Sequence, residues 1–162
     1  MEFILAQEKD IPLIMDIYEK GRAFMRLTGN MYQWNGGYPS EEVVSKDIEG
    51  KNLYLCIDEG EPAAVFALLD GPDKTYNIIK DGKWLSSAPY GVIHRIVVLK
   101  HGRGIAKACF DFGMKKYANI RIDTHKDNLP MRRALEKNGF SQCGIIFLEN
   151  GEERIAFQKE EK

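Results

Sequence analysis

The chain has 162 residues, of which 44% are hydrophobic and 29% are charged, the balance of an ordinary globular protein rather than a disordered one. The length is typical of a single domain, here residues 1–162. Its 23 basic and 24 acidic residues give a formal net charge of −1, so bulk charge gives no reason to expect nucleic acid or an anionic membrane as a partner.

The first 50 residues predict one strand and two helices. Residues 2–7 form a short strand, and Asp10 is placed to cap a helix that has Pro12 in its first turn and extends to about residue 27. Phe24 and Met25 continue the apolar face of that helix and are expected in the core. After a turn-rich segment, Ser40 is placed to cap a second helix.

The remainder alternates strands with helices, which predicts an α/β fold. We expect strands at 52–58 and 62–70, an irregular stretch at 71–91, a strand at 92–99, a helix from 104, a strand near 119–126, a helix at 127–139, and two strands joined by a turn at 149–151.

The stretch HGRGIA, residues 101–106, joins a strand to a helix and contains two glycines. The first N–H groups of a helix have no intrahelical partner, and glycines let the backbone approach a ligand closely. Together with the helix dipole, this arrangement favours a phosphate or pyrophosphate. His101, Arg103 and Lys107 would add cationic character; the alternative is a tight turn with solvated cations.

Two other phosphate-binding motifs do not fit this stretch. It lacks the P-loop pattern, because no Ser or Thr is placed for magnesium. It also lacks a complete G-x-G-x-x-G, because Lys107 occupies the place of the third glycine. A nucleoside triphosphatase and a dinucleotide-dependent dehydrogenase are therefore disfavoured.

Two linked motifs resemble those of the GNAT superfamily of N-acetyltransferases. HGRGIA is similar to the family's R-G-x-G-[IL]-[AG] block, with His101 where Arg or Gln usually stands, and DNLPMRRALEKNGF (127–140) is similar to its N-x-x-A-x-x-L-Y-E-K-x-G-F block. The resemblance implies a mixed, mostly antiparallel central sheet with a splay between two middle strands and helices on both faces.

The resemblance also implies acetyl-CoA as the donor. Its pyrophosphate would lie on the N–H groups of residues 101–106, and its pantetheine would lie beside Ile96, Val97 and Val98. Asn128 would contact the pantetheine or orient the following helix. The donor contacts implied are thus those of Ile96, Val97, Val98, His101, Gly102, Arg103, Gly104, Ile105, Ala106 and Asn128.

One position departs from the family pattern. Leu135 stands where the family often carries a tyrosine that protonates the leaving thiolate. The main interpretation is an N-acyltransferase that moves acetyl to a primary amine of a small molecule or peptide by direct attack. The alternative, motivated by Leu135, is an acyl-CoA-binding sensor without turnover.

His94 is the candidate general base. Acetylation of an amine requires removal of a proton, and imidazole titrates near neutral pH. The alternative is a structural histidine bonded within the sheet. Arg95 is expected on the opposite face of the strand, as an ion-pair partner. His125 is a weaker candidate base, expected at an exposed loop edge.

Aromatic residues gather in the two irregular segments. In GNAT proteins such segments often build the acceptor pocket, so substrate contacts are expected from Tyr32, Trp34, Trp84 and Tyr90, together with Tyr38. The alternative is packing beneath long loops.

Cysteine spacing, the N-terminus and the length of the apolar runs lead to expectations about metal binding and cellular location. Cys56, Cys109 and Cys143 lack metal-ligand spacing, so buried reduced thiols and no metal are expected. The N-terminus does not resemble a signal peptide and no apolar run is long enough to span a membrane, so we expect a cytoplasmic protein. The resemblance leaves a homodimer through the terminal strands open.

Overall fold

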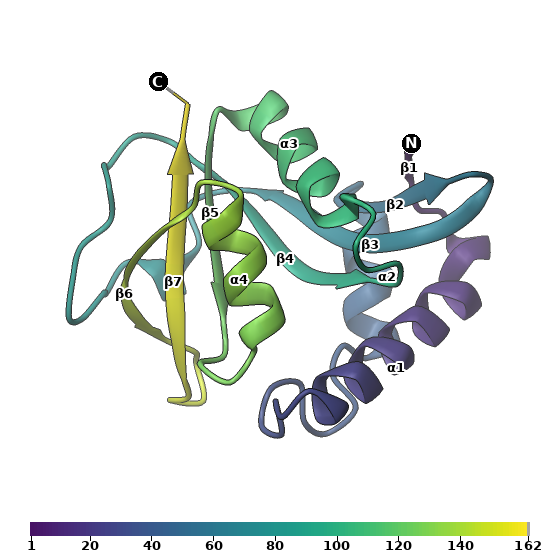
Figure 1. Ribbon diagram of the computed structural model, residues 1–162, viewed down its shortest axis with the longest axis horizontal. Coiled ribbons are helices and arrows are strands. Elements are labelled where there is room, and N and C mark those ends of the chain that lie inside the picture. The colour runs from purple at the N-terminus through teal and green to yellow at the C-terminus, as the bar shows by residue number, and fades with distance from the viewer. Residues whose placement is uncertain (162) are drawn as a thin grey trace.

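The computed structural model describes residues 1–161 as a seven-stranded sheet with four α-helices (Figure 1). The strands are β1 (Glu2–Leu5), β2 (Leu53–Asp58), β3 (Glu61–Asp70), β4 (Gly91–Val98), β5 (Asn119–Thr124), β6 (Ser141–Phe147) and β7 (Glu153–Glu160). The helices are α1 (Ile11–Leu27), α2 (Glu41–Glu49), α3 (Ile105–Tyr117) and α4 (Leu129–Lys137), with short 3₁₀ turns at Glu8–Asp10 and Lys74–Tyr76.

The sheet is open and has the order β1-β2-β3-β4-β5-β7-β6. All neighbouring strands are antiparallel except β4 and β5. These two pair only where Gly91 faces Ile120 and Val92 faces Arg121, and beyond this point they separate. The predicted mixed, mostly antiparallel sheet with a splay between two middle strands is confirmed.

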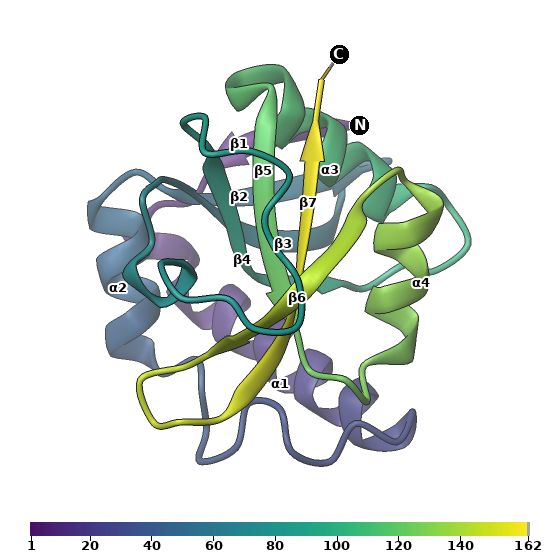
Figure 2. The same ribbon diagram turned by 90° about the vertical axis from the view of Figure 1, so that its left-hand side faces the viewer.

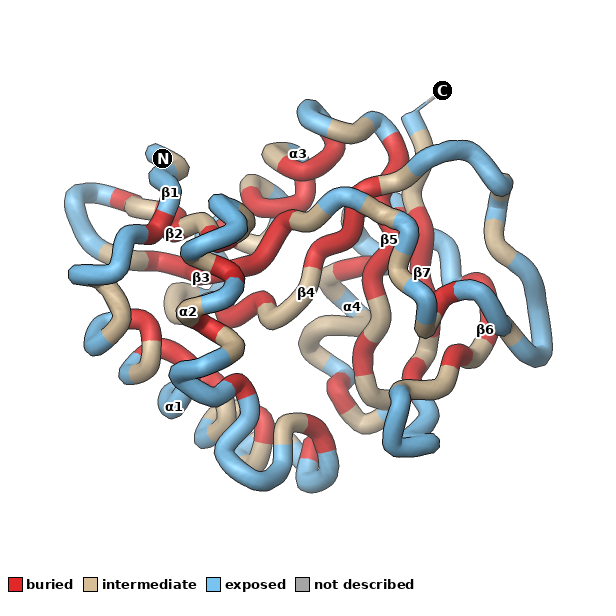
Figure 3. Tube along the Cα trace, turned by 180° about the vertical axis from the view of Figure 1, so that it is seen from behind, coloured by how far each residue is buried: buried red, intermediate tan, exposed pale blue. Residues whose placement is uncertain are grey.

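Helices cover both faces of the sheet, as predicted. Figure 2 shows α2 and α4 on opposite sides of the strands. The alternation of β3 explains this arrangement, because Phe66 and Leu68 pack in the core beneath α3 while Val65 and Ala67 pack in the core beneath α1 and α2. Figure 3 shows the buried residues concentrated along the central strands and the inner sides of the helices.

A β-bulge interrupts β4 at Arg95, whose φ is +53°. The register of β4 against β3 shifts here, between the pairs Val65–Val97 and Ala67–His94. As a result Ile93 and Ile96, three residues apart, enter the same core. His94 pairs with Ala67, which faces α1 and α2, and Arg95 reaches Asp47 of α2, so the two residues lie on the same face. The prediction that Arg95 points to the opposite face is wrong, although its role as an ion-pair partner is confirmed below.

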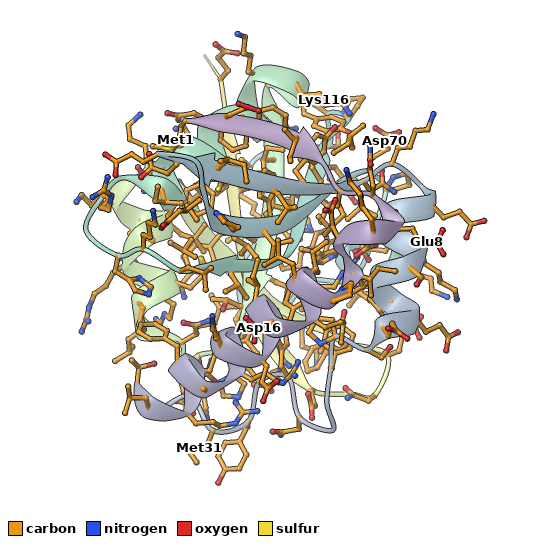
Figure 4. All side chains as sticks on the ribbon, turned by 90° about the vertical axis from the view of Figure 1, so that its right-hand side faces the viewer. Met1, Glu8, Asp16, Met31, Asp70 and Lys116 are labelled. Atoms are coloured by element: carbon orange, nitrogen blue, oxygen red, sulfur yellow. The ribbon has the colours of Figure 1, made fainter. Side chains whose placement is uncertain are left out.

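The two N-terminal helices begin differently. Ser40 caps α2 as predicted, because its hydroxyl accepts a hydrogen bond from the backbone N–H of Val43. Asp10 directly precedes α1, but its carboxylate accepts from the N–H of Gln7, so the predicted side-chain cap of α1 is wrong. Figure 4 shows α1 between the labelled Glu8, which precedes the helix, and Met31, which follows it, with Asp16 on the outer side of the helix.

Within residues 1–161, no helix combines the length and the apolar character needed to cross a membrane.

The contact between α1 and β4 depends on Gly21. A Cβ built there would lie 2.5 Å from Val97 Cγ2 and 3.0 Å from Cγ1. We predict that Gly21→Leu lowers the free energy of unfolding by about 2 kcal/mol, because a packed interface tolerates added volume poorly. Urea denaturation measures this change. Ala23→Leu, on the exposed face of α1, is the matched control; equal stabilities of the two variants would show that this contact is not tight.

Candidate functional site

Two cavities lie where β4 and β5 separate. The glycine-loop cavity, about 600 Å³, is lined by β4 after the bulge, the start of α3, one side of α4 and part of α1. The His94 cavity, about 560 Å³, is lined by β4 at the bulge, β5 and several loops. Met25, Ile96, Asn128 and Met131 line both cavities, so the two spaces adjoin at these four residues.

The glycine loop has the backbone geometry of an anion cradle. Gly102 and Gly104 have φ values of +76° and +74°, in the left-handed region that favours glycine. A Cβ at either position would meet no atom within 4 Å, so the space above the loop is open. The first intrahelical bond of α3 joins the N–H of Ala108 to the Gly104 carbonyl, and the preceding N–H groups of the helix are therefore free of intrahelical partners.

Four lysines line the glycine-loop cavity, namely Lys20, Lys100, Lys107 and Lys137. Lys20 pairs with Asp16, Lys100 with Glu61 and Lys107 with Asp111, at 3.0, 3.4 and 2.6 Å, whereas Lys137 has no carboxylate partner within residues 1–161. Arg103, expected to contribute its charge here, instead pairs with Asp58 at 3.2 Å and Glu59 at 3.3 Å on the β2–β3 hairpin. The negative charge of Glu59, followed by that of Asp58, raises the pKa of Arg103. Its guanidinium is thus held away from the cavity.

His101 and Phe24 form one wall of the glycine-loop cavity. Their rings stack with centroids 4.4 Å apart. Phe24 is only partly buried, so its predicted place in the helix core is wrong, whereas Met25 is buried as expected. The other residues expected to contact the donor line the same cavity: Ile96, Val97, Val98, Gly102, Gly104, Ile105, Ala106 and Asn128.

Asn128 connects the two cavities to the start of α4. Its Oδ1 accepts from the N–H of Met131 and caps the helix, while its Nδ2 donates to Gln33 Oε1 at 3.1 Å. Gln33 Oε1 also accepts from Asn30 Nδ2 at 2.8 Å. Because the cap fixes the orientation of the Asn128 amide, the Gln33 amide is also fixed, with its oxygen toward Asn128.

His94 lies between two aspartates in the His94 cavity. Its Nε2 is 2.8 Å from Asp73 Oδ2, and its Nδ1 is 3.9 Å from Asp123 Oδ2. Tyr76 donates to the same Asp123 oxygen at 2.6 Å. The hydrogen bond from His94, assisted by bonds from Thr75, lowers the pKa of Asp73 from 3.8 to about 2. Asp73 is therefore ionised at neutral pH and positions the imidazole.

Arg95 leaves the bulge toward α2, where its guanidinium bonds to both carboxylate oxygens of Asp47, at 2.7 and 2.8 Å. It also donates to the Tyr38 hydroxyl at 3.1 Å. Burial opposes the charge of Arg95, but these bonds outweigh it and raise its pKa. Tyr18 secures the same bulge by donating to the carbonyl of Arg95. Arg95 is thus an ion-pair partner, as predicted.

The aromatic residues expected to contact substrate occupy different places. Trp34 and Tyr38 line the His94 cavity. Tyr32 lies beside His125 in a separate groove of about 400 Å³. Trp84 and Tyr90 both stack on the Arg121 guanidinium, 4.0 Å from each ring, and line none of these three spaces. Packing therefore accounts for Trp84 and Tyr90.

Leu135 is fully buried in the core beside Phe140 and lines neither cavity. Cys56, Cys109 and Cys143 are free and buried. Among residues 1–161, no group of three or more His, Cys, Asp or Glu side chains is arranged to hold a metal ion.

Sequence reasoning missed Asp73 and Gln33. Asp73 follows β3 in the irregular segment, and its only local signal is the Asp-x-Thr spacing, which the structure uses for a bond from the N–H of Thr75. Gln33 carries no local signal, since its contact with Asn128 spans 95 residues of sequence.

Comparison with solved structures decides the family. An acetyltransferase of the GNAT family from Streptococcus agalactiae 2603 is 32% identical to this chain, with a TM-score of 0.90, covering 99% of this chain and 95% of that one. The chain belongs to the GNAT family of acetyltransferases.

More distant GNAT-fold neighbours agree in fold. A GNAT acetyltransferase from Listeria monocytogenes 4b F2365 is 22% identical, with a TM-score of 0.72, covering 98% of this chain and 94% of that one. A NatC complex solved with Gag peptide and CoA is 15% identical, with a TM-score of 0.64 and complete coverage of both chains. No protein-family model and no curated protein matches this GNAT chain.

The glycine loop of this GNAT protein yields a direct binding prediction. Gly104→Glu is expected to weaken CoA binding at least tenfold, because the new carboxylate enters the open space above the loop, where the N–H groups favour an anion. Isothermal titration calorimetry measures the affinity. Gly60→Glu is the matched control, since Gly60 has a φ of +79°, has no atom within 4 Å of its Cβ position, and lies on the β2–β3 hairpin. Equal CoA affinities for the two variants would contradict the assignment of this loop.

Proposed function

We propose that this GNAT protein transfers the acetyl group of acetyl-CoA to a primary amine of a small molecule or peptide. The observation that carries the proposal is the junction of two unlike cavities beside the β4 bulge. One has a glycine loop, free helix N–H groups and lysines, and the other holds the Asp73–His94 pair.

The glycine-loop cavity fits the donor. The N–H groups at the start of α3 and the left-handed glycines suit a pyrophosphate, and Lys137, which has no carboxylate partner within residues 1–161, adds positive charge to the cavity. Ile96, Val97 and Val98 form the β4 wall along which a pantetheine arm would lie. With the pantetheine along this wall, the thioester end would lie at the junction, where Asn128 and Met131 line both cavities.

His94 would act as the general base on the acceptor side. Asp73 accepts a hydrogen bond from Nε2–H, which leaves the lone pair on Nδ1 to take a proton from the acceptor ammonium. Acetyl-CoA, when bound, supplies the carbonyl carbon that the neutral amine attacks. The new C–N bond replaces the C–S bond and CoA departs as a thiolate. The amine nitrogen loses one proton to His94 before attack and a second proton to water as the amide forms. The His94 imidazolium would then return its proton to the thiolate, which regenerates the neutral base.

Leu135 provides no proton for the departing thiolate, because it is apolar and buried. The imidazolium of His94, which lines the adjoining cavity, would be the proton source instead. The alternative function, an acyl-CoA sensor without turnover, rests on the absence of the tyrosine at position 135, and the assay below separates the two functions.

The proposal is tested by measuring free thiol released from acetyl-CoA across a panel of primary amines. We expect amine-dependent release, with the acetylated amine identified by mass spectrometry. If the protein binds acetyl-CoA tightly but none of the amines in the panel increases thiol release, the sensor function is supported and the enzyme function is overturned.

The role of His94 is tested by His94→Gln. General-base catalysis contributes about 10²- to 10⁴-fold, so kcat should fall by at least 100-fold while CoA affinity stays within twofold of the wild type. Rapid-quench measurement of a single turnover reports the chemical step. An unchanged single-turnover rate at saturating amine would remove His94 from catalysis and favour the structural alternative.

A further inference from the structure

The charges on the wall of the His94 cavity limit which amines it can accept. Its cationic lining residues, apart from His94, are Arg95 and Arg154, and each already has a carboxylate partner within residues 1–161. Arg95 bonds to both oxygens of Asp47, and only 14% of the Arg95 side chain is exposed. Arg154 pairs with Glu152 at 3.2 Å and is 7% exposed. Neither guanidinium brings an uncompensated positive charge to a ligand.

The negative charges are compensated less completely. Asp123 is 10% exposed, and Oδ2 accepts from the neutral Tyr76 hydroxyl, 3.9 Å from His94 Nδ1. Asp123 Oδ1 accepts no hydrogen bond from residues 1–161. The side-chain atoms that are both fully enclosed and without a partner are Asn30 Oδ1 and Arg121 Nε, and Asp123 Oδ1 is not one of them. Oδ1 is therefore open to the cavity that Asp123 lines. A carboxylate removed this far from water is costly unless a cation accompanies it.

Gln33 provides a neutral donor in the same cavity. The side chain is 7% exposed, and its Oε1 is held by Asn128 and Asn30. Its Nε2 donates to no group of residues 1–161 and is likewise not fully enclosed. This amide can donate to a neutral carbonyl of a ligand, but it carries no charge with which to balance a carboxylate.

We infer that the acceptor is a cationic primary amine without a carboxylate beside its amino group, bound with the ammonium against Asp123. This inference rests on the proposed function and specifies its substrate class. The ammonium of an alkylamine would be balanced by Asp123 and ionised Asp73. In an amine beside a neutral amide, the amide carbonyl could also accept a hydrogen bond from the Gln33 amide. A free α-amino acid would bring its carboxylate against Asp73 and Asp123 with no unpaired cation to receive it.

Matched pairs of acceptors test this inference on the full-length protein. The pairs are amino-acid amides against their free amino acids, for glycine, alanine and leucine, and ethylamine against alanine, so that the α-amino group is the single amino group in each acid. We expect kcat/KM for the carboxylate-free member to exceed that of the acid at least tenfold in every pair that reacts. If a free amino acid is acetylated as well as its amide, the inference is overturned while the proposed function stands. Failure of every amine, including those in the wider panel, overturns the proposed function and this inference with it.

Asp123→Asn tests the anchoring contact. We expect KM for the best amine to rise at least tenfold and the amide-over-acid preference to shrink, with CoA affinity unchanged as evidence of a folded protein. Glu149→Gln is the matched control, because Glu149 lines the same cavity but its side chain is 75% exposed, where water screens its charge. Equal effects of the two substitutions on KM and on acceptor preference would show that Asp123 does not anchor the ammonium.

Discussion

Beyond Val92 and Arg121, the parallel strands β4 and β5 separate, and the rest of the site depends on that separation. A continuous ladder would fill the middle of the sheet with paired backbone groups and packed side chains. The bulge at Arg95 bends β4. The Tyr18 hydroxyl, which donates to the Arg95 carbonyl, and the Arg95–Asp47 ion pair hold this bulge in place. The constraint is therefore built from α1 and α2, which hold the bulge in place against β3.

The divergence gives the molecule two spaces with opposite electrostatic character that share a narrow boundary. On one side, helix N–H groups and Lys137 favour an anion. On the other side, Asp73 and Asp123 flank His94 and favour a cation. A reaction that moves an acyl group from an anionic carrier to an amine that binds as a cation needs both environments within reach of one reacting carbon. Asn128 links them physically, since it caps α4 and bonds to Gln33 from the boundary itself.

The features that could be predicted from sequence are those fixed by neighbouring residues. The glycine loop and the Ser40 cap each depend on a few consecutive positions, and the two motifs that resemble the GNAT family indicated the fold. The features that could not be predicted depend on segments that meet only in the folded chain. Asp73 reaches His94 across 21 residues, and Gln33 reaches Asn128 across 95. The bulge interrupts the alternation of side chains along β4. It could not be predicted because an arginine, and not a glycine, adopts the left-handed conformation there.

A crystal structure with bound CoA is the most direct test of the donor and acceptor cavities. We expect the pyrophosphate on the N–H groups between Gly102 and Lys107, the pantetheine along β4 from Val98 to Ile96, and the sulfur at the boundary with the His94 cavity. A pyrophosphate bound elsewhere, or a sulfur that ends away from the boundary shared by Ile96 and Asn128, would contradict the assignment of the two cavities to donor and acceptor.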